Sequence, residues 1–155
     1  MPNIDSVLSF FPLRAASLAD FVEIVKTEKC TEVVINPFVD VLNGSYFSGS
    51  SGTIGDPWFV LGCQLEFVSR LPSGRKLVCR ECQFRQFGTT LGEEAAPERH
   101  KLDIRLRLIA EQKAGELRSR LPGIVVHELG RDNQPMSEAD YEELHREAAA
   151  ERVSV

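Results

Sequence analysis

A short turn between two alternating runs is the feature that most constrains the fold of this chain. The segment Leu71–Gly74 has proline at its second position, where the fixed φ of proline suits a type I turn. Gly74 follows where a left-handed residue is needed. Apolar residues alternate before the turn, and further ones after it can share their face: Phe59, Leu61, Cys63, Leu65, Phe67, then Val78, Cys82 and Phe84. The pattern predicts an antiparallel hairpin over 58–87.

The register of this hairpin follows from aligning the two apolar sets. The alignment places Cys63 opposite Cys82 and Phe67 opposite Val78. A bulge at Gly74 would slip the pairing by one residue and break this match. We expect the matched register, because it keeps the apolar side chains on one face.

Four further elements have recognisable start or stop signals. Ser17 is an N-cap for a helix over 18–29, and Ser137 with Asp140 resembles a capping box for a helix over 138–152. A β-branched run predicts a strand over 32–36 that stops at Asn36-Pro37, and 124–127 predicts another strand.

The remaining segments are less regular. We expect a loop over 43–56, rich in glycine and serine and carrying Tyr46 and Phe47, and a polar loop over 88–100. Segment 101–109 alternates strictly, as a strand does, although its leucines and arginines are good helix formers. We favour a third strand there, followed by a helix over 110–121 that ends at Pro122-Gly123.

These elements predict an α+β fold. We expect an antiparallel sheet of three to five strands, with hairpin 58–87 central and two or three helices packed mainly on one face. With 155 residues and 43% hydrophobic residues, the chain is long and apolar enough for one core. We assign 1–136 to a single α+β domain and 137–155 to an acidic C-terminal helix or tail.

Charge and composition restrict the partners. The net charge is −5, of which −4 lies from Ser137 onward, so the rest of the chain is nearly neutral and does not attract polyanions over long range. No apolar stretch reaches the roughly 20 residues that span a bilayer, so we expect no membrane partner. Four cysteines are few for a disulfide framework. We therefore predict a soluble cytoplasmic protein.

Cys79 and Cys82 have the spacing of a zinc knuckle. A zinc site needs about four ligands, but no second pair is present, and Cys30, Cys63 or His100 would have to come from distant segments. Residues three apart in a strand also point to opposite faces. We predict ordinary half-buried cysteines and no cofactor, with zinc at Cys79 and Cys82 as the alternative.

Catalytic motifs are not assembled along the chain. His127-Glu128 starts like a zinc-protease helix motif, but the second histidine is missing. Gly55 is followed by Asp56-Pro57 rather than by the lysine and hydroxyl of a P-loop. The catalytic residues are therefore unknown, and we incline towards a protein that is not an enzyme.

Candidate binding residues come from the predicted strands and loop. If 101–109 is a strand, Lys101, Arg105 and Arg107 project from one side of the sheet, and the hairpin adds Arg85. We predict a non-catalytic intracellular binding or assembly protein that contacts another protein or a second copy. Its candidate partner-binding residues are Arg85, Arg105, Arg107, Tyr46 and Phe47. The alternative is a protein that binds or processes nucleic acid through the arginines, with zinc at the two cysteines.

Overall fold

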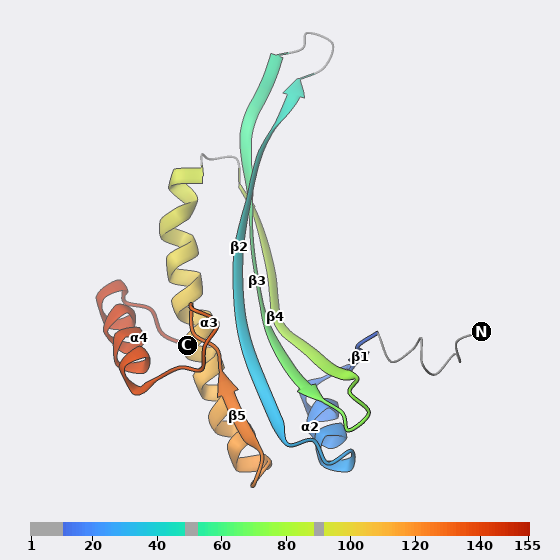
Figure 1. Ribbon diagram of the computed structural model, residues 1–155. Helices are drawn as coiled ribbons and strands as arrows, with labels where there is room; N and C mark the ends of the chain where they lie inside the picture. Colours follow the sequence, from blue (N-terminus) through green and yellow to red (C-terminus); the bar gives the residue numbers. More distant parts are fainter. Residues whose placement is uncertain (1–10, 49–52, 89–91) are drawn as a thin grey trace, which may run out of the picture.

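The computed structural model describes residues 11–48, 53–88 and 92–155, and for 41–48, 53–59, 86–88 and 92–96 it describes the backbone alone. Five strands and three helices lie within these ranges (Figure 1). In chain order they are β1 (Leu13–Arg14), α2 (Leu18–Thr27), β2 (Glu32–Ser48), β3 (Thr53–Arg70), β4 (Lys76–Gly88), α3 (Gly92–Arg120), β5 (Val125–Glu128) and α4 (Glu138–Glu151).

The strands form one sheet in the order β1-β4-β3-β2-β5. Its three central strands are antiparallel, but β1 is parallel to β4 and β5 is parallel to β2. The α+β class and a strand number within the expected three to five are present, whereas the expectation of a purely antiparallel sheet is wrong. The reason is the long helix α3, which returns the chain along the sheet so that β5 runs in the same direction as β4 and β2.

The predicted hairpin is confirmed, but its register is wrong. Gly74 has a φ of +91° and donates to the carbonyl of Leu71 at 2.8 Å, while the N–H of Leu71 donates to Arg75 at 2.9 Å. The turn thus contains the bulge at Gly74 that slips the pairing, and Phe67 lies opposite Cys79 instead of Val78.

A second irregularity lies between Cys63 and Leu65, where Cys63 pairs with Phe84 instead of Cys82. Cys82 occupies this bulge with a φ of +54°. Because of this bulge, Val78 and Phe84 lie on opposite faces of the sheet, and the predicted common face of Val78, Cys82 and Phe84 is absent.

The expected stop at Asn36-Pro37 and most of the expected loop over 43–56 are also wrong. β2 continues to Ser48, and β3 begins at Thr53. Pro37 is tolerated because β5 pairs with β2 no further than Ile35, which leaves Pro37 on an edge strand. Of the predicted loop, 49–52 lies outside the described residues.

The helix α3 replaces both the predicted polar loop over 88–100 and the predicted strand over 101–109. Residues 89–91 of that loop lie outside the described residues. The strict alternation arises because α3 is buried on two sides. Leu106, Ala110 and Ala114 pack into the core below the sheet, whereas Ile104 and Leu108 pack against α4. Helix propensity and burial on two sides together outweigh the strand pattern. The predicted end before Pro122-Gly123 is correct.

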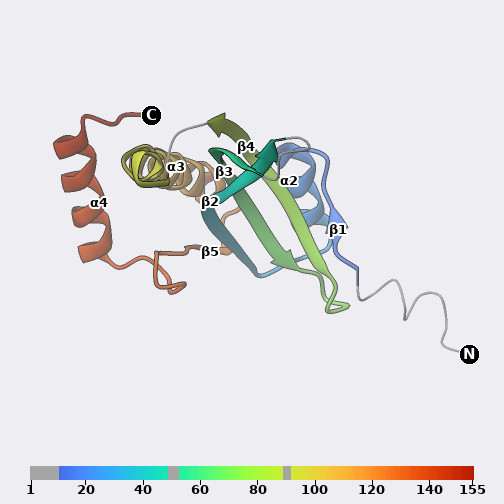
Figure 2. The ribbon, with the colours of Figure 1, turned by 90° about the horizontal axis from the view of Figure 1, so that it is seen from above.

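The main core lies between the sheet and two helices. α2 and α3 both contribute to it, and the ring of Phe21 from α2 lies 6.2 Å from that of Phe67 from β3. In Figure 2 both helices lie on the same side of the sheet, and no described helix covers the other side. We call the side without helices the outer face.

The last helix begins at the predicted capping box of Ser137 and Asp140, and the caps and bounds of α2 and β5 also follow the predictions closely. Leu144 and Ala148 of α4 pack against Ile104 and Leu108 of α3. The apolar stripe of α4 is therefore covered by the chain itself. None of the described helices has the length and hydrophobicity needed to cross a membrane.

Candidate functional site

The outer face presents side chains in rows that cross β2, β3 and β4. Because inward and outward residues alternate, the register determines each row. The rows are Val34–Val68–Val78, Asn36–Glu66–Arg80, Phe38–Gln64 and Asp40–Gly62–Arg85. The row at Gln64 has no direct partner on β4, because the bulge at Cys82 and Gln83 lies there.

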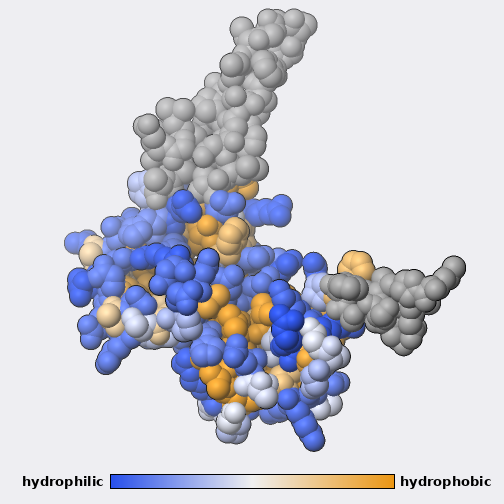
Figure 3. All heavy atoms as spheres, viewed as in Figure 1, coloured by the Kyte–Doolittle hydropathy of each residue, from blue (hydrophilic) through white to orange (hydrophobic). Residues whose placement is uncertain are grey.

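An open hollow of about 700 Å³ occupies the last two rows. We call it the outer-face hollow. Gly62 leaves space at its centre because it has no side chain, and the bulge interrupts the neighbouring strand. The lining consists of Phe38, Asp40, Val60, Gly62, Cys63, Gln64, Gln83, Phe84 and Arg85. Figure 3, which looks onto this face, shows apolar side chains between hydrophilic ones.

The lining chemistry suits binding. Phe38 is 50% exposed and gives the hollow an accessible apolar surface. The amides of Gln64 and Gln83 each offer donors and an acceptor, and Arg85 adds a guanidinium opposite Gly62. Cys63 donates from its thiol to the carbonyl of Cys82 at 3.3 Å, and burial raises its pKa.

Cys79 and Cys82, which have the spacing of a zinc knuckle, lie in different environments. Cys79 belongs to the main core with 2% exposure, and burial raises its pKa to about 11. Cys82 is exposed in the bulge. Among the described residues, no three His, Cys, Asp or Glu side chains are grouped so as to hold a metal ion. The zinc alternative gains no support from this geometry.

The three candidate arginines do not share one surface. Arg85 lines the outer-face hollow, and Arg105 borders a different hollow beside α3. Arg107 is 8% exposed and donates to both carboxylate oxygens of Asp103, at 3.1 and 3.2 Å, and to the carbonyl of Leu129. Because 101–109 is helical, its basic residues point in several directions. Tyr46 and Phe47 lie in β2, next to the register shift after Ser45.

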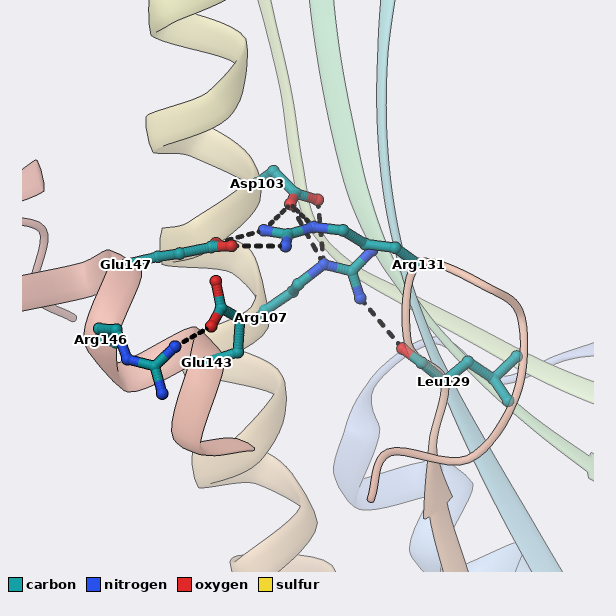
Figure 4. Close-up of polar contacts among 7 residues, drawn as sticks. All are labelled: Asp103, Arg107, Leu129, Arg131, Glu143, Arg146 and Glu147. Carbon is teal, nitrogen blue, oxygen red and sulfur yellow. Dashed lines mark hydrogen bonds and ion pairs between the residues drawn. The ribbon is translucent and has the colours of Figure 1, made fainter. Parts of the chain in front are cut away.

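Arg107 belongs to an ionic network that holds the C-terminal segment on α3 (Figure 4). Arg131 donates to Asp103 at 3.0 Å and to the two oxygens of Glu147 at 3.0 and 2.7 Å. Its bond with Glu147 raises the pKa of Arg131 and lowers that of Glu147. Arg146 and Glu143 form a separate pair on α4. The network therefore ties α4 and the segment after β5 to α3.

The carboxyl of Glu128 lies beside this network, and the sequence pattern did not predict that it is buried. Glu128 is 3% exposed, accepts a hydrogen bond from the Tyr141 hydroxyl at 2.7 Å and lies 3.8 Å from Arg118. Burial raises its pKa. It borders a hollow of about 370 Å³ together with Glu111 and His127. In the sequence, Glu128 stands out only as part of the incomplete zinc-protease motif His127-Glu128, which does not predict a buried carboxyl.

Glu128 links β5 to the two helices α3 and α4 through its polar contacts. A carboxyl with a raised pKa can hold or release a proton at higher pH than usual. Its hydrogen-bond donor comes from α4 and its cationic neighbour from α3, and Arg118 also donates to the carbonyl of Val126 at 2.9 Å. The three groups thus fix β5 between the two helices.

Comparison with known proteins adds no assignment. The chain matches no family model, and neither a curated protein nor a solved structure is similar to it. Its function is therefore argued from the geometry of the described residues.

Proposed function

We propose that this chain is a non-catalytic binding protein that holds a segment of another protein in the outer-face hollow. The observation that carries the proposal is an open hollow of about 700 Å³, beside a half-exposed Phe38, on the face that no described helix covers. Cores of protein interfaces are enriched in aromatic residues and arginine, and both are present here.

The lining indicates the chemistry of the partner segment. Phe38 and Val60 offer apolar contact for one large side chain lying over Gly62. Gln64 and Gln83 can pair with the peptide N–H and C=O groups of an extended segment. Arg85 can form two parallel hydrogen bonds with a carboxylate. We therefore expect a polypeptide with an apolar residue close to an acidic one.

The other surfaces considered for assembly are less suitable. The apolar stripe of α4 packs on α3, and most of the predicted loop over 43–56 lies in β2 and β3. A cytoplasmic location remains part of the proposal, supported by four cysteines that are all unpaired.

The test uses a library of random peptides displayed on phage and selected on the purified protein. Selected peptides are synthesised, and their affinities are measured by fluorescence polarisation for the wild type and two variants. Phe38→Ser removes the apolar anchor. Val125→Ser is the matched control, since Val125 is 52% exposed and lies on β5, outside the hollow.

We expect Phe38→Ser to weaken peptide binding at least tenfold, because buried aromatic anchors dominate interface energies. Val125→Ser leaves the affinity unchanged. Equal affinity for both variants, or no selected peptide, contradicts the proposal. A dimer in light scattering that Phe38→Ser dissociates would make a second copy the occupant instead. Binding of labelled single-stranded DNA that falls steeply with salt would favour a nucleic-acid partner.

A further inference from the structure

A second, smaller hollow lies on the helix side of β4. α2 packs against β4, whereas α3 packs against β2, β3 and β5, so the part of β4 near its bulge is left beside α3 without close cover. The hollow measures about 220 Å³. We call it the slot. It is lined by Cys63, Cys82, Gln83, Phe84, Leu102, Arg105, Leu106 and Ile109.

The slot is almost entirely apolar. Phe84 is 47% exposed, and the partly buried Leu102 and Ile109 of α3 face the same space. A volume of about 220 Å³ equals about seven groups the size of a water molecule, counted at about 30 Å³ each. The space therefore suits an aliphatic chain of about six to eight carbons.

One positive charge borders this apolar space. Arg105 is exposed on α3 and has no hydrogen-bond or ion-pair partner among the described residues. The nearby cation Lys113 is already engaged by two carboxylates, Glu81 at 3.9 Å and Glu116 at 3.8 Å. The guanidinium of Arg105 is therefore the group at the slot that can pair with an anion.

We propose that the slot binds a medium-chain aliphatic carboxylate, with the chain against Phe84 and Ile109 and the carboxylate paired with Arg105. Apolar burial supplies the affinity, and the guanidinium selects an anionic head group. The two hollows share Cys63, Gln83 and Phe84 around the bulge, but the slot lies beside α3 on the helix side, whereas Phe38 and Gly62 belong to the outer-face hollow alone. The slot takes its anion at Arg105 and the outer-face hollow its apolar residue at Phe38, so each proposal has its own test.

The cysteines provide a built-in probe of occupancy. All four lie within the described residues, and Cys82 is exposed while Cys30, Cys63 and Cys79 are buried. Alkylation of the folded protein by N-ethylmaleimide, followed by mass spectrometry, therefore reports on Cys82 at the slot. Octanoate is the test ligand and 1-octanol its uncharged counterpart. We expect saturating octanoate to slow the alkylation of Cys82 at least fivefold.

The contribution of Arg105 is measured with Arg105→Gln, and Arg120→Gln is the matched control, since Arg120 is exposed on the same helix and does not line the slot. We expect Arg105→Gln to raise the octanoate concentration needed for half-protection at least threefold, with no change for 1-octanol. Arg120→Gln behaves as the wild type. The proposal is overturned if octanoate leaves the alkylation rate unchanged, if 1-octanol protects as well as octanoate in the wild type, or if the two arginine variants weaken protection equally.

Discussion

The two faces of the sheet are built from the same strands but are used differently. On the helix side, Ile35, Leu65 and Phe67 are fully buried under α2 and α3. One residue further along each strand, the outer face carries half-buried valines, the Glu66–Arg80 ion pair and the exposed Phe38. The covered face holds the main core, and we propose that the uncovered face binds the partner. The following predictions test this division.

The largest expected difference is between two neighbours on β3. Phe67→Ala removes a fully buried ring that packs on Phe21, and we expect a loss of about 3–5 kcal/mol in the free energy of unfolding. Val68→Ala on the outer face should cost about 1 kcal/mol or less. Urea denaturation followed by circular dichroism measures both. Similar losses for the two variants would contradict this division, because they would mean that Val68 on the outer face is packed as tightly as Phe67 in the core.

A smaller difference is expected between two arginines. Arg131→Ala removes the hydrogen bonds to Asp103 and Glu147 that hold α4, and we expect a loss of about 1.5 kcal/mol. Arg80→Ala removes one exposed pair with Glu66 on the outer face and should cost about 0.5 kcal/mol. A double-mutant cycle of Arg131 with Glu147 checks the larger value. A coupling energy near zero would contradict the role of the network.

The carboxyl of Glu128 should give the helix side its own pH dependence. Burial raises its pKa above the ordinary value of 4.5, so the folded protein keeps this proton in a range where the unfolded chain has lost it. Its contribution to stability is greatest at low pH and falls as pH rises from about 4.5 through the raised pKa. Glu128→Gln should abolish this loss of stability with rising pH, because glutamine does not titrate.

Thermal melts of Glu128→Gln and wild type between pH 4 and 8 measure this effect. The variant should gain stability relative to the wild type as pH rises. Glu66→Gln on the outer face is the control and should change stability by less than about 0.5 kcal/mol, because its pair with Arg80 is partly exposed. Parallel pH profiles for Glu128→Gln and wild type would rule out the proposed contribution.

The smallest expected effect concerns the bulge that shapes both hollows. Cys82 has a left-handed backbone, which costs a non-glycine residue about 1–2 kcal/mol. Cys82→Gly relieves this strain but adds chain entropy on unfolding, so we expect a net gain of about 0.5 kcal/mol. Cys82→Ala keeps the strain and should not gain. A loss for Cys82→Gly in urea denaturation would argue against strain at the bulge.

Features set by neighbouring residues could be predicted from the sequence, and features set by distant contacts could not. The turn at Gly74 and the capping box at Ser137 depend on a few adjacent residues, and both are present. The register of the hairpin failed at two bulges: the one at Gly74 was set aside because it breaks the match of the apolar residues, and the one at Cys82 has no glycine to mark it. Segment 101–109 of α3 was mistaken for a strand because α4, far along the chain, buries a second side of the helix.

The outer-face hollow was anticipated only as a face of the hairpin. Arg85 was among the predicted binding residues and does line it, but Phe38 and Gln64 were not. Phe38 comes from the part of β2 that was expected to have ended at Pro37, so its place opposite Gln64 depends on the length of the strand. The predicted grouping of Arg85 with Arg105 and Arg107 depended on a strand that is absent.

The most direct test of the account is to fill the outer-face hollow and measure peptide affinity. A side chain at position 62 would project into the hollow, and its Cβ would meet the carbonyl of Phe84 at an ordinary 3.7 Å. Gly62→Leu should therefore fold with unchanged or greater stability and bind the selected peptides at least tenfold more weakly. Unchanged affinity in a fully folded Gly62→Leu variant would contradict the central claim.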